Sequence, residues 1–245
     1  MHSYLSRFLV AATLLVSARA VAADALPEGT RPKSDRVVVT ISVDGLAAYY
    51  VDDPKADMPN MRKLAAEGAR ASMMKASTPT VTWPNHTTLV TGDNPARHGV
   101  VGNNYYDRAT GKKVVLISDP VFDKDQIVKV PTIYDAAKSN GLKTAAIRWP
   151  ATRNARTLDW TTPDVRSAEL FTKYSTPSLL AAGQKAGINI LDGSVEAKGN
   201  NVFDSKDELF TRLFDLILHE DRPNLALLHV IDVDPHRTSI RPAIG

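Results

Sequence analysis

The sequence predicts an α/β fold in which helices flank a mainly parallel sheet. Runs of β-branched and apolar residues, typical of buried strands, recur along the chain. Segments with helical signals separate these runs, and such alternation indicates parallel pairing of the strands. The composition supports a globular fold, because 43% of the 245 residues are hydrophobic and 23% are charged.

The first 23 residues have the pattern of a secretory signal peptide. A short basic start precedes an apolar run from Phe8 to Val16, and small residues that suit cleavage follow at 18–22. The alternative is a membrane anchor, but the run is shorter than the roughly 20 residues that span a bilayer. We therefore expect an exported protein, periplasmic or secreted, with residues 24–35 as a polar lead-in and no stable membrane span.

The first elements of the domain are one strand and one helix. The strand is predicted over 36–42, a β-branched run that breaks at Asp44. The helix is predicted over 59–67, with proline near its start and Gly68 as its terminator.

Helices and strands continue to alternate along the rest of the chain. Ser205 and Glu208 are spaced as a capping box, and apolar residues three or four positions apart follow them, as on one face of a helix. The predicted elements are a helix over 132–140, a strand over 142–148, a helix over 176–187, a helix over 205–217 and a strand over 224–231.

Carboxylates follow two of the predicted strands. Asp44 follows the first strand, and Asp232 and Asp234 follow the last. Ligands of open parallel sheets gather at the carboxyl ends of strands, and oxygen ligands converging there could bind a divalent cation. The alternative is that each aspartate is a turn or helix-cap residue.

Thr82 lies in an unusual segment, residues 77–92, that is rich in threonine and contains Trp-Pro-Asn-His. A helix is predicted to begin around Pro84 and Asn85, so Thr82 would lie at or just before its N-terminus, where anions such as phosphate are favoured. A hydroxyl becomes a nucleophile only when a base or a metal activates it. Thr82 as a simple N-cap is the alternative, and His86 is either a ligand or a structural residue.

A glycine-flanked loop at residues 99–107 carries two asparagines. An amide of Asn103 or Asn104 could donate to a phosphoryl oxygen, although a plain turn explains both residues equally well. Nearby aromatic residues could stack on a base or simply pack; they are Trp83, Tyr105 and Tyr106.

Several classes of function are excluded or disfavoured. The chain has no cysteine, which excludes disulfide scaffolds and cysteine nucleophiles. It also has no Gly-x-Ser-x-Gly elbow, no His-Glu-x-x-His, no Walker A loop and no Gly-x-Gly-x-x-Gly. The formal charge of +3 is small, so nucleic-acid binding is not expected.

Taken in order, these segments resemble the nucleotide pyrophosphatase/phosphodiesterase family of the alkaline phosphatase superfamily. The match is dense from about 37 to 107 and sparse afterwards. It is carried by Ile41-Ser-Val-Asp-Gly45, Met58-Pro-Asn-Met-Arg-Lys-Leu64, Pro79-Thr-Val-Thr-Trp-Pro-Asn-His86, Thr91-Gly92, His98-Gly-Val-Val-Gly-Asn103, Tyr106-Asp107 and Trp149-Pro150. The resemblance implies an alkaline-phosphatase-like fold, with residues 36–245 as the N-terminal part of its domain.

The resemblance also implies the chemistry of a two-zinc hydrolase. Asp44 would be a ligand of one zinc ion, and Thr82 would be both its ligand and the nucleophile that forms a covalent phospho-threonine. Asn103 would hydrogen-bond a phosphoryl oxygen. The substrate would be a small phosphodiester or nucleotide-like molecule, and the enzyme would be an exported phosphodiesterase or nucleotide pyrophosphatase.

The sequence departs from the family pattern near its end. Asp234 matches an aspartate that ligates zinc in the family, but Thr238 stands where the family has histidine, and the later ligands do not appear. An apparently truncated, incomplete copy with little or no activity is therefore expected. A one-base shift after Asp234 is one hypothesis for this departure, and a divergent or arbitrarily cut end is another. A phosphate-monoester hydrolase and a non-catalytic pseudoenzyme or binding module remain alternatives.

Overall fold

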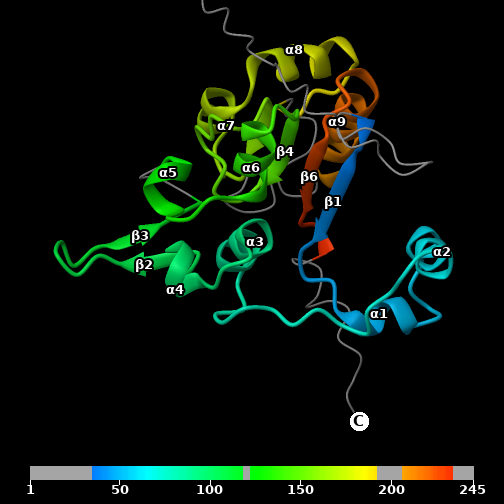
Figure 1. Cartoon of the computed structure of the whole chain (residues 1–245), viewed down its shortest axis with the longest axis horizontal. Helices are drawn as coiled ribbons and strands as arrows, with labels where there is room; N and C mark the ends of the chain where they lie inside the picture. Colours follow the sequence, from blue (N-terminus) through cyan, green and yellow to red (C-terminus); the bar gives the residue numbers. More distant parts are fainter. Residues whose placement is uncertain (1–34, 118–121, 192–205, 234–245) are drawn as a thin grey trace, which may run out of the picture. The chain divides into compact units, whose positions relative to one another are not determined.

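The computed structural model of the chain describes residues 35–117, 122–191 and 206–233 (Figure 1). The predicted signal peptide, the lead-in up to residue 34 and the acid Asp234 lie outside the described residues. Among the described residues, no helix is both long and apolar enough to cross a membrane.

A four-stranded parallel sheet forms the centre of the described domain. Its strand order is β1 (Val38–Val43), β6 (Leu225–Val230), β4 (Thr144–Trp149) and β5 (Trp160–Pro163). All three neighbouring pairs are parallel. The predicted fold class is thereby confirmed, and β1 lies beside β6 although most of the chain separates them (Figure 1).

One face of the sheet packs against three helices. They are α7 (Ala168–Tyr174), α8 (Pro177–Lys185) and α9 (Asp207–Glu220). The apolar positions of α9 recur three or four residues apart and are buried against side chains of β4 and β6. They are Phe210, Leu213, Phe214 and Ile217.

The opposite face packs against α6 (Ile133–Ser139) and α3 (Thr82–Thr91). Their buried residues contact the alternate residues of the same strands, as expected from the two-residue period of a strand. Trp149 of β4 is also fully buried in this layer, because the strand is irregular between Ile147 and Trp149 and the alternation of faces shifts there. The sheet therefore separates two apolar layers.

The predicted elements agree closely with the observed ones where strong end signals exist. The helix α2 (Pro59–Glu67) has the predicted bounds, and α6 lies between Thr132, its N-cap, and Asn140, its C-cap. The N-cap of α9 is Lys206, one residue after the predicted Ser205, which lies outside the described residues.

Short elements were not predicted from the sequence. They are α1 (Ala48–Asp52), α4 (Pro95–His98), α5 (Lys124–Ile127), α7, β5 and the antiparallel pair β2 (Asn104–Tyr106) and β3 (Lys113–Val115). The β2–β3 pair follows the loop that carries Asn103. Residues of β3, α3 and the loop share a small apolar cluster that includes Trp83, Val100 and Val114. This cluster ties the loop to the start of α3.

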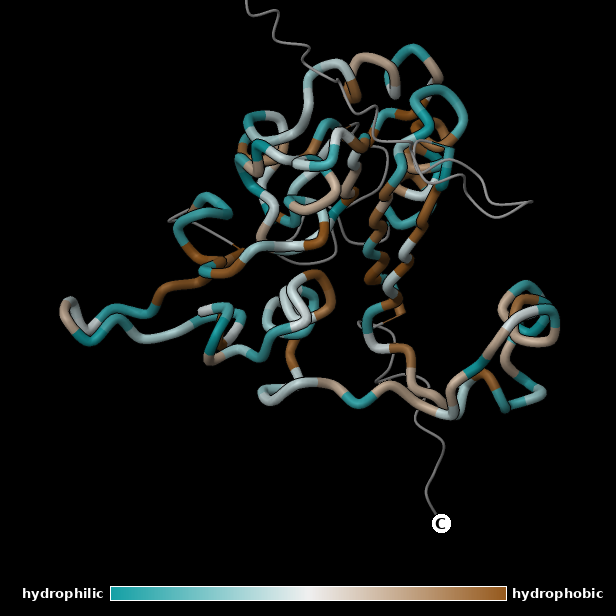
Figure 2. The backbone as a smooth tube through the Cα atoms, in the orientation of Figure 1, coloured by the Kyte–Doolittle hydropathy of each residue, from teal (hydrophilic) through white to brown (hydrophobic). Residues whose placement is uncertain are grey.

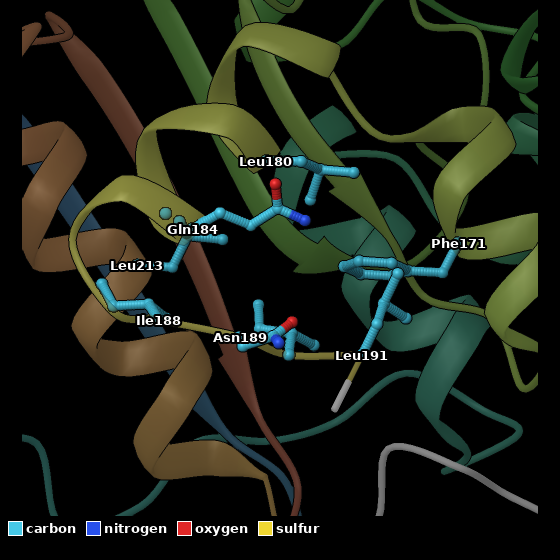
Figure 3. A pocket seen from close by; sticks show the side chains of 9 residues that line it. Phe171, Leu180, Gln184, Ile188, Asn189, Leu191 and Leu213 are labelled. Carbon is cyan, nitrogen blue, oxygen red and sulfur yellow. The ribbon is translucent and has the colours of Figure 1, made fainter. Parts of the chain in front are cut away.

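The close packing of α8 on α9 leaves only a small cavity. It has a volume of about 20 Å³ and is lined mainly by apolar side chains such as Leu180, Ile188 and Leu213 (Figure 3). A side chain added at Gly183 would come within 2.9 Å of Leu213, so α8 and α9 approach each other closely. The cavity holds a single water molecule at most and is no place for a substrate.

The outer strand of the sheet exposes apolar side chains. Val38 and Ile41 of β1 are 56% and 57% exposed, and Val39, on the same face as Ile41, is exposed as well. Figure 2 shows apolar residues along both β1 and β6. Unlike β6, β1 has a sheet neighbour on only one side among the described residues.

Candidate active site

Asp44 and Thr82 meet at the carboxyl end of β1. Asp44 follows the last residue of the strand, and its backbone N–H donates to the carbonyl of Val230 on β6 at 2.8 Å. Thr82 Oγ1 donates to Asp44 Oδ2 at 3.0 Å. A carboxylate and a hydroxyl that are 38 residues apart in the sequence thus form one polar pair, and the carboxylate lies at the edge of the sheet where the sequence predicted it.

Thr82 is the first residue of α3, and its N-cap is Val81. The helix therefore begins two residues before the predicted start at Pro84, and the alternative role of Thr82 as N-cap is wrong. Proline at the third helical position lacks an N–H, which is why it is tolerated in the first turn. The positive end of the helix dipole lies beside the Thr82 hydroxyl.

Asn103 is held against the same helix end. Its Oδ1 accepts a hydrogen bond from the backbone N–H of Trp83 at 2.8 Å. This bond satisfies one of the N–H groups that a helix start leaves open. It also orients the amide so that Nδ2, which has no hydrogen-bond partner within the described part of the chain, remains a donor close to Thr82.

His86 is a structural residue of the site. Its Nδ1 is 2.8 Å from the carbonyl oxygen of Thr82, which can only accept, so Nδ1 donates. Its Nε2 then accepts from the hydroxyl of Ser42 on β1 at 2.9 Å. Burial lowers the pKa of His86 to about 3, so the ring is neutral. His86 therefore positions Thr82 against β1 and leaves no nitrogen for a metal.

His229 lies beside Asp44 and was not among the residues predicted for the site. It lies on β6 opposite Ser42 and is 1% exposed. Its Nε2 is 3.5 Å from Asp44 Oδ2, and its ring centroid is 4.1 Å from that of His86. The only signal in the sequence was a single polar residue within an apolar strand.

The environment keeps Asp44 ionised. Burial by itself raises the pKa of this carboxyl, but the imidazole of His229 and the hydroxyl of Thr82 lower it, and the net pKa lies below the ordinary value. Asp44 therefore carries a negative charge that suits a cation.

Asp232 has a different task from Asp44. Its Oδ2 accepts from the backbone N–H of Asp207 at the start of α9 at 3.2 Å. Asp207 in turn accepts from the N–H groups of Ile231 and Asp232 at 2.8 and 2.7 Å. These bonds join α9 to the end of β6, so the helix-cap alternative describes Asp232.

Trp83 is a packing residue, and its partner is a further acid that the sequence reasoning missed. The indole is almost fully buried, and its Nε1–H donates to Asp164 Oδ2 at 2.9 Å. Asp164 follows β5 at the same edge of the sheet, and burial raises its pKa. In contrast, Tyr106 on β2 is exposed.

Few of the described residues offer atoms that could hold a metal ion. Asp44 and Thr82 offer two oxygen atoms that suit one zinc ion, and the buried Nε2 of His229 faces the same carboxylate. No group of three His, Cys, Asp or Glu side chains is placed for a metal within residues 35–117, 122–191 and 206–233. The third predicted ligand, Asp234, lies outside these ranges.

Residues 38–240 match the family model of type I phosphodiesterase / nucleotide pyrophosphatase. The chain belongs to this family. It is 36% identical over 117 residues to ectonucleotide pyrophosphatase/phosphodiesterase family member 3 of Rattus norvegicus. The matched segment covers 46% of this chain and 13% of the relative. It is 35% identical over 113 residues to the venom phosphodiesterase of Macrovipera lebetinus, with the same shares of 46% and 13%.

Another relative is a pyrophosphatase/phosphodiesterase of Schizosaccharomyces pombe, 37% identical over 115 residues that cover 46% of this chain and 23% of the relative. The matched part of the family member thus spans less than a quarter of each of these relatives.

Solved structures show the same fold. Murine ectonucleotide pyrophosphatase/phosphodiesterase 5 is 22% identical with a TM-score of 0.53, and the match covers 82% of this chain and 44% of that one. An inactive threonine-to-alanine variant of the murine protein, in complex with AMP, has a TM-score of 0.54. Phosphonoacetate hydrolase from Sinorhizobium meliloti is 20% identical with a TM-score of 0.53, and the match covers 84% of this chain and 48% of that one. The fold is alkaline-phosphatase-like.

Proposed function

We propose that this family member is an exported, zinc-dependent hydrolase of phosphodiester or pyrophosphate bonds that acts through a phospho-threonine at Thr82. The observation that carries the proposal is the 3.0 Å contact between Thr82 Oγ1 and the ionised Asp44 at the carboxyl end of β1. Membership of the family and the similarity to an ectoenzyme and a venom phosphodiesterase support the reaction and the export.

The first step is attack by the Thr82 oxygen on phosphorus. Oγ1 gives up its proton to water and bonds to phosphorus while the bond to the leaving oxygen breaks, and that oxygen takes up a proton from water. Water then hydrolyses the phospho-threonine and restores the Thr82 hydroxyl. Asp44 Oδ2 accepts the hydroxyl hydrogen and so aims Oγ1, while His86 holds the Thr82 carbonyl. Asp44 and Thr82 would hold one zinc ion, and Asp234 would be a further ligand of the two-zinc site; the metal would supply a lowered pKa of the hydroxyl and stabilisation of negative charge on oxygen.

Two further features of the site suit a phosphoryl group. The amide Nδ2 of Asn103 is available to donate to a phosphoryl oxygen, because Oδ1 is held by the Trp83 N–H. The N-terminal end of α3 adds a positive partial charge beside Thr82. We infer a small nucleotide-like diester as substrate, in keeping with the AMP complex of the murine homologue.

The test compares the full chain with Thr82→Ala in zinc-containing buffer, using a chromogenic phosphodiester and the matching monoester. We expect the diester to be the better substrate and Thr82→Ala to lower turnover at least about 100-fold. Mass spectrometry of acid-quenched protein should find a phosphoryl group on the peptide that contains Thr82. Thr172→Ala is the control, because this exposed hydroxyl bonds only within α7.

Each alternative has its own outcome. Faster turnover of the monoester would replace the proposal with a phosphate-monoester hydrolase on the same scaffold. Zinc binding without turnover, unchanged by Thr82→Ala, would indicate a pseudoenzyme or binding module.

A further inference from the structure

The first two residues of α3 are tied to different strands of the sheet. The hydroxyl of Thr82 donates to Asp44, which follows β1. The indole Nε1–H of Trp83 donates at 2.9 Å to Oδ2 of Asp164, which follows β5. Among the described residues, β1 and β5 are the outer strands of the sheet, with β6 and β4 between them. The first turn of the helix is therefore held from both outer strands.

The contact between Trp83 and Asp164 is buried. The two residues are 81 positions apart in the sequence and are 1% and 6% exposed. The indole packs in the apolar cluster with Val100 and Val114, and the guanidinium of Arg153 lies 5.7 Å from the ring centroid. A buried donor and acceptor are costly to separate where water cannot replace the bond, so the contact fixes the direction of the indole.

The backbone of Trp83 links the same residue to Asn103. Its N–H donates to Asn103 Oδ1 at 2.8 Å, and its carbonyl accepts from the hydroxyl of Thr87 at 2.8 Å. A rotation of the first helical turn would move this N–H and, through it, the amide that is the proposed donor to phosphate. The neighbouring Thr82 would move as well, because both residues belong to one helical turn. The bond to Asp164 opposes such a rotation from the β5 side.

This task requires an acceptor at Asp164 but not a negative charge. An indole nitrogen can only donate, so Oδ2 accepts whether or not the other carboxyl oxygen carries a proton. The amide oxygen of asparagine can accept the same hydrogen bond, whereas leucine has a similar branched shape and no acceptor. Substitution by each of these two residues therefore separates the hydrogen bond from the packing of the side chain.

We propose that Asp164 is a positioning residue that aligns the Thr82 hydroxyl with the Asn103 amide for attack on phosphorus, acting through the indole of Trp83. The inference rests on the proposed function and deepens it, because it assigns to the reaction a residue that acts through another side chain.

The first test is turnover of the chromogenic phosphodiester by the full chain in zinc-containing buffer. We expect Asp164→Leu to lower kcat about 10–100-fold, because small displacements of reacting groups are costly, while KM and Tm change little. Asp164→Asn should restore most of the lost kcat. Trp83→Phe removes the donor instead and should lower kcat as Asp164→Leu does. The double variant should be no slower than either single variant, because all three lose the same bond.

The matched control is Asp159, which lies at the other end of β5. Its Oδ2 accepts from the backbone N–H of Thr144 at 3.0 Å, so it also joins two strands. Asp159→Leu should lower Tm without lowering kcat in the temperature range where the variant is folded. A merely structural role of Asp164 would give the same result as this control.

A second readout does not depend on turnover. In ¹H–¹⁵N spectra of the full chain, the backbone N–H of Trp83 and the side-chain NH₂ of Asn103 report the arrangement of the site. We expect Asp164→Leu to shift both signals, and Asp164→Asn to leave them near their wild-type positions. Asp159→Leu should shift neither.

The outcomes separate this inference from the proposed function. An unchanged kcat in Asp164→Leu, an equal loss in Asp164→Asn, or unshifted Trp83 and Asn103 signals would each overturn the positioning role. If Asp164→Leu does not fold, Trp83→Phe carries the same expectations. If the wild-type chain turns over neither the diester nor the monoester, the proposed function is wrong and the spectra alone decide: shifted signals support the positioning by Asp164, and unshifted signals overturn it.

Discussion

The amide of Asn103 has two ends with different tasks. Its oxygen accepts from the Trp83 N–H at 2.8 Å, which stabilises the start of α3, and its nitrogen is the proposed donor to phosphate. Asn103→Asp separates these tasks, because the carboxylate still accepts but no longer donates and repels a phosphoryl group. We expect a loss in kcat/KM of about 10²–10³-fold, typical of removing one transition-state donor, with little change in Tm.

The matched control for this prediction is Asn104→Ala, one residue further along on the exposed strand β2. It should leave both activity and Tm unchanged. Near-normal turnover in Asn103→Asp would show that the residue only anchors α3. A large fall in Tm would show that the acceptor is not reproduced by the carboxylate.

Sequence reasoning found the residues whose types are unusual in their local context. The family resemblance implied that Asp44 and Thr82 act at one site, and the structure brings their side chains together. His229 was missed because an isolated histidine in an apolar strand has the same pattern as a packed core residue. Its position opposite Ser42 depends on the pairing of β1 with β6, which no local pattern encodes.

Asp135 joins three parts of the chain. Its Oδ2 accepts from the Thr132 N–H at 2.8 Å in the capping box of α6 and pairs with Lys124 of α5 at 2.6 Å. Its Oδ1 accepts from the hydroxyl of Thr157. Burial by itself raises the pKa of this carboxyl. The hydrogen bonds from Lys124, Thr157 and Thr132 together lower the pKa by more than burial raises it, so it lies below the ordinary value.

We expect Asp135→Asn to lower the free energy of unfolding by about 1–3 kcal/mol, the range for losing charge-assisted bonds and part of a cap. A carboxyl whose pKa is depressed in the folded state stabilises the fold at pH values above the ordinary aspartate pKa of about 4. This contribution is lost as pH falls through the lower pKa of the folded state. The difference between wild type and Asp135→Asn should therefore shrink in urea titrations below about pH 4.

Asp125→Asn is the control for Asp135, because Asp125 also contacts Lys124, at 3.2 Å, but is largely exposed. It should change stability by less than about 0.5 kcal/mol. Equal effects of the two variants, or an Asp135 effect that grows at low pH, would contradict the role of this carboxylate as a junction.

Helices with clear end signals were predictable, and short ones were not. Pro59 and Gly68 mark the two ends of α2, and Thr132 and Asn140 mark the two ends of α6. The four-residue helices α4 and α5 are too short to show a periodic pattern. The same holds for the three-residue strands of the β2–β3 pair.

At the scale of the whole molecule, the alternation of strands and helices predicted a parallel sheet but not its strand order. The order β1-β6-β4-β5 pairs the first strand with the last, with Val38 opposite Leu225. This pairing brings Asp44 beside His229, so the site depends on contacts between the two ends of the described chain. Such distant contacts are set by tertiary packing, which local periodicity cannot reveal.

The exposed edge strand β1 is a surface through which molecules of this protein should associate. An edge strand with apolar side chains on both faces favours association between molecules, because its open N–H and C=O groups can pair with another chain. We expect Ile41→Lys, at a position that is 57% exposed, to reduce concentration-dependent association in sedimentation velocity without lowering Tm. Leu64→Lys on α2 is the control, since it removes an apolar residue of similar exposure outside any sheet. Association that persists in Ile41→Lys, or falls equally in both variants, would mean that β1 is not the surface that associates.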